Sequence, residues 1–113
     1  MELENSELIK PEIDKRKYRR AKLITQVKCE AVGRENVMVT RDISVGGMFV
    51  NDRDPFPTHS AVTLQFRLSP TAPLLSCGGT VVYSIRGVGM GIKFAELAEE
   101  VRQALQKFID EAN

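Results

Sequence analysis

Basic side chains gather in one short stretch of the chain, where they could bind an anionic ligand. Six of them fall within eight positions: Lys15, Arg16, Lys17, Arg19, Arg20 and Lys22. A guanidinium group can bond a phosphate through two N–H groups and can also stack on a purine ring, whereas an ammonium group does only the first well. Taken alone, such a stretch also fits a solvated charged linker. It therefore predicts phosphate binding only if a second motif supports it.

A second group of polar residues ends a predicted strand over residues 37–44. Period-2 geometry places Asp42 and Ser44 on one face of that strand, together with Met38 and Thr40. An ionised Asp can accept two N–H bonds from the Watson–Crick edge of guanine, and a Ser hydroxyl can donate to a phosphate or carbonyl oxygen. The two glycines that follow can adopt φ > 0. Taken alone, this motif also fits a simple turn.

Together, the two groups resemble the paired signatures of PilZ domains. Arg16-x-x-x-Arg20 is similar to the RxxxR motif of that family, and Asp42-x-Ser44-x-x-Gly47 is similar to its [D/N]xSxxG motif. The order of the motifs and the strand hairpin between them also agree with the family. Each motif is weak by itself, but the conjunction is specific.

The resemblance implies a receptor for cyclic di-GMP. Arg16 and Arg20 would contact phosphates and guanine faces from a segment that wraps over the ligand. Asp42 would hold a guanine edge, Ser44 would contact polar ligand atoms, and Gly47 would allow close approach. No bond in the ligand is broken, so we expect a receptor that is not an enzyme and needs no cofactor.

The resemblance extends beyond the signature residues, from about Lys15 to Phe94. Within it, Lys15, Lys17, Arg19 and Gly46 are candidates for additional ligand contacts. PilZ proteins bind either one cyclic di-GMP or an intercalated pair. Lys15 favours the pair, because a pair brings four phosphate charges to the arginine segment.

Apolar patterns predict the elements that position these residues. Alternation predicts six strands, over residues 22–32, 37–44, 48–50, 61–69, 74–85 and 88–94. Helical spacing of apolar residues predicts an amphipathic helix over 96–111. Short strands with hairpin-length turns indicate an all-β chain with one C-terminal helix, built as a six-stranded antiparallel β-barrel.

Three parts of the chain are expected. Residues 1–14 form a flexible N-terminal arm, residues 15–95 form the PilZ-like barrel domain with its arginine segment, and residues 96–113 form the helix packed on the barrel. Within the barrel domain, residues 33–36 are expected to turn the chain between two strands. Phe49 is expected to fill the barrel interior.

Composition and charge exclude several classes of protein. The 113 residues suit one domain, and with 42% apolar residues in short runs no membrane span is expected. Net charge is −4 over residues 1–14, +6 over 15–53 and −1 over 54–113, which favours a compact anionic ligand over long nucleic acid. The first residues do not resemble a secretory signal, so we expect a cytoplasmic location and reduced cysteines.

Catalysis and metal binding have little support in the sequence. His59 is the only histidine, and it lies in a Pro-containing loop with no Cys nearby. Ser44 has no partner histidine at a recognisable spacing. We therefore expect no metal site and no nucleophile.

Two alternatives to the receptor stay open. The basic stretch could bind RNA or single-stranded DNA, which would show steep salt dependence and an affinity that rises with strand length. The chain could also be an adaptor of PilZ fold that no longer binds nucleotide. If it is a receptor, its signal passes to a downstream protein partner on a separate chain, in a pathway that the sequence does not specify.

Overall fold

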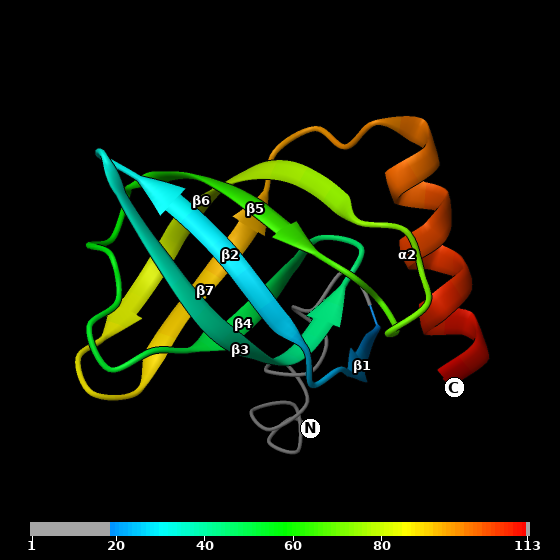
Figure 1. Cartoon of the computed structure of the whole chain (residues 1–113), viewed down its shortest axis with the longest axis horizontal. Coiled ribbons are helices and arrows are strands. Elements are labelled where there is room, and N and C mark those ends of the chain that lie inside the picture. The colour runs from blue at the N-terminus through cyan, green and yellow to red at the C-terminus, as the bar shows by residue number, and fades with distance from the viewer. Residues whose placement is uncertain (1–18, 113) are drawn as a thin grey trace, which may run out of the picture.

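Strands dominate the structure, a computed structural model that describes residues 19–112 (Figure 1). The elements are β1 (Arg20–Lys22), β2 (Gln26–Ala31), β3 (Arg34–Ser44), β4 (Gly47–Asn51), β5 (Ala61–Phe66), β6 (Leu75–Ile85), β7 (Gly89–Phe94) and α2 (Glu99–Ala112). Each predicted strand has a counterpart among them.

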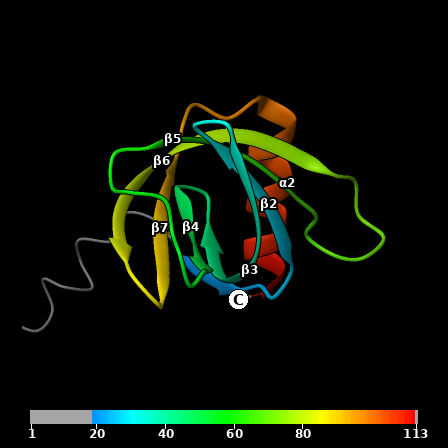
Figure 2. The same cartoon turned by 60° about the vertical axis from the view of Figure 1, so that its left-hand side comes forward.

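Six of the strands close into an antiparallel barrel. Hydrogen bonds join them in the order β3, β2, β5, β6, β7 and β4, and β3 also pairs with β4, which closes the ring. Figure 2 shows the strands running round the barrel, with α2 behind them. The prediction of a six-stranded antiparallel barrel with one C-terminal helix is confirmed.

The short strand β1 is separate from β2, and this separation was not predicted. Residues 23–25 interrupt the run, so that β1 pairs with the end of β3, where Arg20 lies opposite Ser44. β2 pairs with the beginning of the same strand. The continuous strand predicted over 22–32 is therefore two strands that follow one edge of β3.

Apolar side chains that alternate along the strands fill the barrel. Val27 and Cys29 of β2, Leu64 and Phe66 of β5, and Met90 of β7 are each at most 1% exposed. Burying a side chain of this size stabilises the fold by about 1.5–3 kcal/mol. Period 2 identifies these residues because each is flanked by neighbours on the opposite face.

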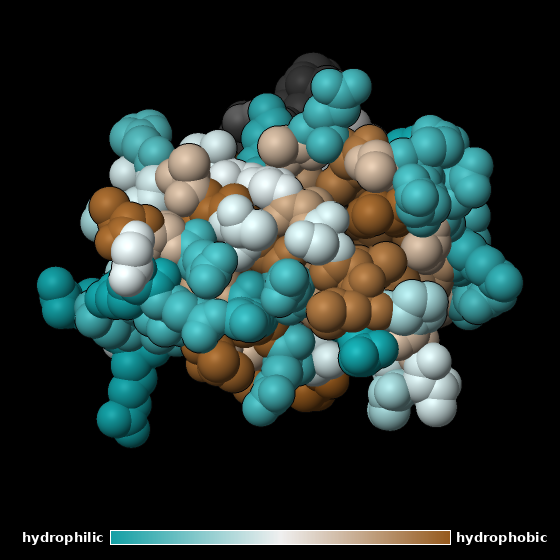
Figure 3. Space-filling view, turned by 45° about the horizontal axis from the view of Figure 1, so that its top comes forward, coloured by the Kyte–Doolittle hydropathy of each residue, from teal (hydrophilic) through white to brown (hydrophobic). Residues whose placement is uncertain are grey.

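Helix α2 covers one end of the barrel (Figure 1). Its buried residues Val101, Leu105 and Ile109 follow one another at four-residue spacing, and the first two belong to the same apolar cluster as the barrel strands. Figure 3 shows hydrophobic surface on the side where the helix meets the barrel. No helix within residues 19–112 is both long and apolar enough to span a membrane.

The two cysteines lie on either side of Leu64. Cys29 pairs with Leu64 across β2 and β5, and Cys77 pairs with it across β5 and β6. Two strand spacings separate them by about 9–10 Å, too far for a disulfide. Both thiols are free, and burial raises the pKa of Cys29 to about 12 and that of Cys77 to about 11. Both thiols therefore stay protonated near neutral pH.

A two-residue turn joins β2 to β3, and it replaces the predicted turn over residues 33–36. Val32 has φ 48° and Gly33 has φ 74°, the pattern of a type I′ hairpin turn. The side chain of Val32 is 89% exposed. A β-branched residue is strained in the left-handed region, so Val32 costs stability and gains no buried contact in return.

We expect Val32→Asn to raise the free energy of unfolding by about 1 kcal/mol, because Asn tolerates positive φ and Asn-Gly favours a type I′ turn. For a domain of this size that gain raises Tm by about 4 °C. Thermal unfolding followed by circular dichroism measures it. The control is Val37→Asn at an exposed position of β3, which should not stabilise. A Tm for Val32→Asn at or below the wild-type value would contradict this account.

Candidate ligand-binding groove

A groove of about 480 Å³ lies on the outer surface of the barrel, across β1, β3, β4, β6 and β7. Its lining includes the described signature residues Arg20, Asp42, Ser44 and Gly47, together with Gly46, a candidate for an additional contact. The structure therefore brings the end of the arginine segment and the strand-end motif into one site.

A β-bulge in β3 aims Asp42 into this groove. Thr40 pairs with Val50 of β4, whereas Asp42 pairs with Phe49, so Arg41 is an extra residue that has no partner in the ladder. Such a residue bends the strand and shifts the alternation of its side chains by one position.

The bulge overturns one prediction and supports another. Met38 and Thr40, before the bulge, are buried, whereas after it Ile43 is buried and Asp42 is only partly buried. The prediction that Asp42 shares a face with Met38 and Thr40 is therefore wrong. Asp42 and Ser44 do lie together, since both line the groove.

Arg20 and Asp42, which both line the groove, form an ion pair. Two guanidinium nitrogens of Arg20, Nε and a terminal one, each lie 2.6 Å from Oδ1 of Asp42. The two side chains are only 28% and 24% exposed, so water screens the pair less than on an open surface. Arg20 belongs to β1, and the expectation that it lies before the first strand is wrong.

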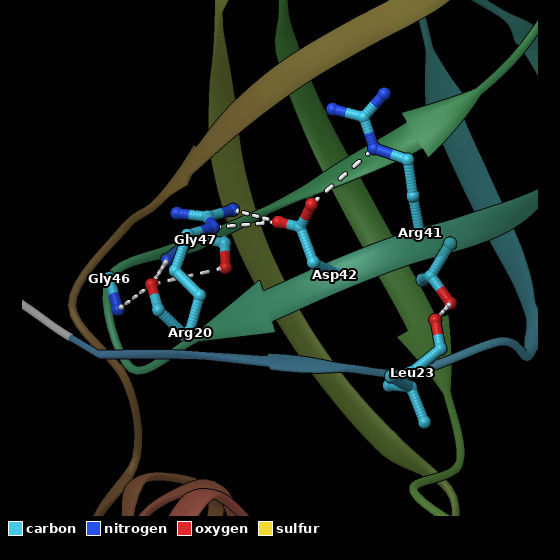
Figure 4. Close-up of polar contacts among 8 residues, drawn as sticks. Arg20, Leu23, Arg41, Asp42, Gly46 and Gly47 are labelled. Carbon is cyan, nitrogen blue, oxygen red and sulfur yellow. Dashed lines mark hydrogen bonds and ion pairs between the residues drawn. The ribbon is translucent and has the colours of Figure 1, made fainter.

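Ser44 holds the turn that follows β3. Its Oγ accepts the backbone N–H groups of Gly46 at 3.1 Å and of Gly47 at 3.2 Å, and the hydroxyl donates to the Gly47 carbonyl at 3.4 Å (Figure 4). The Ser44 side chain is buried. In this structure it shapes the turn, and its contact with a ligand stays a prediction.

Gly47 is required by a close backbone approach. A Cβ at this position would lie 2.2 Å from the carbonyl oxygen of Ile92 in β7. The conformational reason expected from sequence does not apply, because Gly47 is not among the residues with positive φ. The absence of a side chain lets β4 approach β7 at the rim of the groove.

Sequence reasoning missed the residues that continue the groove beyond Asp42. The guanidinium carbon of Arg41 lies 4.0 Å from the ring centroid of Phe49, and Tyr83 of β6 stacks beside that ring at a centroid distance of 6.1 Å. Lys93 adds a cation to the lining of the groove.

Phe49 lies on the outer face, so the expectation that it fills the barrel is wrong. Its pairing partner Asp42 faces the same way, and its neighbours along β4 face the core.

One family model matches almost the whole chain: the PilZ domain, over residues 14–111. The chain belongs to the PilZ domain family. Among curated proteins none matches this chain.

Several solved structures resemble this PilZ domain in fold. The inhibitor of motility MotI/DgrA of Bacillus subtilis has a TM-score of 0.73 and 21% identity, over 86% of this chain and 50% of that one. The PilZ domain of Escherichia coli YcgR with c-di-GMP has a TM-score of 0.71 and 12% identity, over 87% of this chain and 91% of that one. PlzA of Borreliella burgdorferi in complex with c-di-GMP has a TM-score of 0.63 and 14% identity, over 91% of this chain and 45% of that one. This PilZ domain thus spans about half of MotI and of PlzA.

Part of the predicted ligand segment lies outside the described residues. Lys15, Arg16 and Lys17 precede residue 19, so their ligand contacts stay predictions. Arg19 contacts α2 and not the groove: its guanidinium lies 2.8 Å from Oδ1 of Asp110, with side chains 62% and 52% exposed.

The described part of this PilZ domain offers no cluster of metal ligands. Within residues 19–112 no group of three His, Cys, Asp or Glu side chains could hold a metal ion. His59 lies in the loop between β4 and β5 and has φ 80°.

Thr40 fixes the break between β1 and β2 and so positions Arg20. Its buried Oγ1 donates to the carbonyl of Leu23 and accepts the N–H of Thr25 at 3.0 Å. These bonds satisfy backbone groups that the interruption removes from the ladder. Thr40 therefore holds β1 against the end of β3, where Arg20 meets Asp42.

We expect Thr40→Val to lower the free energy of unfolding by about 2 kcal/mol, because it leaves the backbone groups of Leu23 and Thr25 without their buried partner. Urea unfolding measures the loss, and amide hydrogen exchange should show faster exchange in β1. Thr63→Val, at an exposed position of β5, is the matched control and should change stability little. Equal stability of Thr40→Val and wild type would contradict this role.

Proposed function

We propose that this PilZ domain is a receptor for cyclic di-GMP that binds the ligand in the groove. The observation that carries the proposal is the Arg20–Asp42 pair, which unites the two motifs in one partly buried site. The similarity in fold to the YcgR PilZ domain with c-di-GMP and to PlzA in complex with c-di-GMP supports the same ligand.

The chemistry of the groove suits a guanine edge beside a phosphate. Arg20 occupies Oδ1 of Asp42, whereas Oδ2 is 3.4 Å from Nε of Arg41, too far for a strong bond. Each carboxylate oxygen can accept more than one bond, so Asp42 can take N–H groups of guanine without releasing Arg20. Each charge-assisted contact contributes about 1.5–3 kcal/mol.

The arginine segment supplies the remaining contacts and the signal. Arg16, with Lys15 and Lys17, closes over the phosphates, and several contacts must form together to offset an ordering cost of about 1–2 kcal/mol per residue. The closed segment then presents a new surface to a separate protein partner. The domain acts as a receptor and catalyses no reaction.

Nucleic acid is the weaker candidate for the ligand. The groove of about 480 Å³ fits a compact ligand, and the structure places the cations Arg20, Arg41 and Lys93 around it. An extended strand would need a basic track along the surface.

We expect Arg16→Ala, Arg20→Ala and Asp42→Asn each to lower the affinity for cyclic di-GMP at least tenfold. Each change removes one charge-assisted contact, and tenfold corresponds to about 1.4 kcal/mol. Calorimetric titration gives affinity and stoichiometry together, with GTP and cyclic di-AMP as specificity controls.

The control variant is Arg86→Ala, an exposed arginine outside the groove, and circular dichroism verifies that each variant is folded. Wild-type affinity in both Arg20→Ala and Asp42→Asn would reject the groove as the site. A wild-type domain that binds no cyclic di-GMP would favour the adaptor. An affinity for single strands that rises with length would favour nucleic acid.

Ligand binding should also change amide exchange at the end of α2, because Arg19 pairs with Asp110 of that helix. An exposed ion pair is worth about 0–1 kcal/mol, so a phosphate can take Arg19 from Asp110 at little cost. We expect amide exchange in residues 107–112 to become faster when cyclic di-GMP binds. In Asp110→Asn this response should be smaller, because the pair is already broken.

Glu111→Gln is the control, since it removes an exposed acid from the same helix end and should keep the full response. Identical exchange in α2 with and without bound ligand would rule out a signal through Arg19.

A further inference from the structure

The groove continues from Asp42 along one row of paired residues on the outer face. Asp42 of β3 lies opposite Phe49 of β4, Phe49 lies opposite Gly91 of β7, and Gly91 lies opposite Tyr83 of β6. Three strand spacings place Tyr83 about 14 Å from Asp42. The far end of this row is aromatic, and it lies outside both sequence motifs.

Arg41 and Tyr83 cover Phe49 from the solvent side. Phe49 lies on the outer face of the barrel, yet it is only 3% exposed. The Arg41 guanidinium carbon lies 4.0 Å from its ring centroid, and the Tyr83 ring is inclined by 29° to it. Two planar groups thus pack on one buried ring, a favourable arrangement for both the cation and the aromatic pair.

The Tyr83 ring packs so closely on Gly91 that no other residue fits at that position. A Cβ on Gly91 would lie 2.3 Å from Cε2 of the Tyr83 ring, so the ring rests on the bare backbone of β7. Packing on Phe49 and Gly91 fixes one side of the ring. Tyr83 is nevertheless 47% exposed, and the Arg41 side chain is 58% exposed. Both planar groups therefore offer a surface to the groove.

We propose that Arg41 and Tyr83 form a stacking surface for the second guanine of cyclic di-GMP, the base that Asp42 does not hold. This inference rests on the proposed receptor function. Cyclic di-GMP carries two guanines, and a carboxylate at one end of the groove can hold the edge of one of them. A tyrosine ring and a guanidinium plane are the side chains that stack on a purine without requiring a particular edge.

The test is calorimetric titration of the full chain with cyclic di-GMP. We expect Tyr83→Ala and Arg41→Ala each to weaken binding roughly tenfold to a hundredfold, the usual effect of losing one base-stacking group. Tyr83→Phe keeps the ring and should bind as wild type does. Ile85→Ala removes a similarly exposed apolar side chain of β6 outside the groove, and it should also bind normally.

Tyrosine fluorescence distinguishes stacking of the ligand on Tyr83 from a purely structural role of that residue, because only stacking would change the emission on ligand binding. The chain has two tyrosines and no tryptophan, so in a Tyr18→Phe background Tyr83 is the only fluorophore of its kind. A guanine stacked on Tyr83 should quench its emission in proportion to occupancy of the site. GTP at the same absorbance corrects for light absorbed by the nucleotide.

The outcomes separate this inference from the function on which it rests. Wild-type binding with unchanged affinity in Tyr83→Ala and Arg41→Ala, both verified as folded, would overturn the stacking surface alone. Tyr83 emission that saturating ligand leaves unchanged would do the same. A wild-type chain that binds no cyclic di-GMP would overturn the receptor function and the stacking surface together.

Discussion

The β-bulge at Arg41 is the constraint on which the site depends. Without the extra residue, period 2 would turn Asp42 into the core beside Thr40 and leave Ile43 in water. An ionised carboxylate in an apolar interior costs several kcal/mol unless it is paired and hydrogen-bonded. The bulge instead buries Ile43 completely and leaves Asp42 in the groove, where Arg20 reaches it (Figure 4).

The bulge was not predictable from the sequence because the pattern around it is consistent with a regular strand. Val37, Val39 and Ile43 are separated by two and four residues, as if they shared one apolar face of a regular strand. The structure exposes Val37 and Val39 at 63% and 40% and buries Ile43. Arg41 and Asp42 are both polar, so neither residue type reveals which one is extra. The barrel itself was predictable, since its interior accepts almost only apolar side chains.

The rest of the site depends on contacts between distant segments. The two motifs were recognisable because their residue types and order are specific, and the structure adds that Arg20 already pairs with Asp42. Tyr83 and Lys93 join the groove through the order of the strands, which no local pattern encodes. Phe49 lies within an apolar run of the sequence, so its place on the outer face follows only from its pairing with Asp42 and from the side chains that cover it.

Amide chemical shifts during a titration with cyclic di-GMP test the central claim most directly, because they report where the ligand binds. If the ligand binds in the groove, the amide signals of Asp42, Gly46, Gly47 and Lys93 should shift together with one saturation curve. Gly33, at the β2–β3 turn outside the groove, should not shift. No shifts at saturating ligand, or shifts concentrated at Gly33 while the groove signals stay in place, would contradict it.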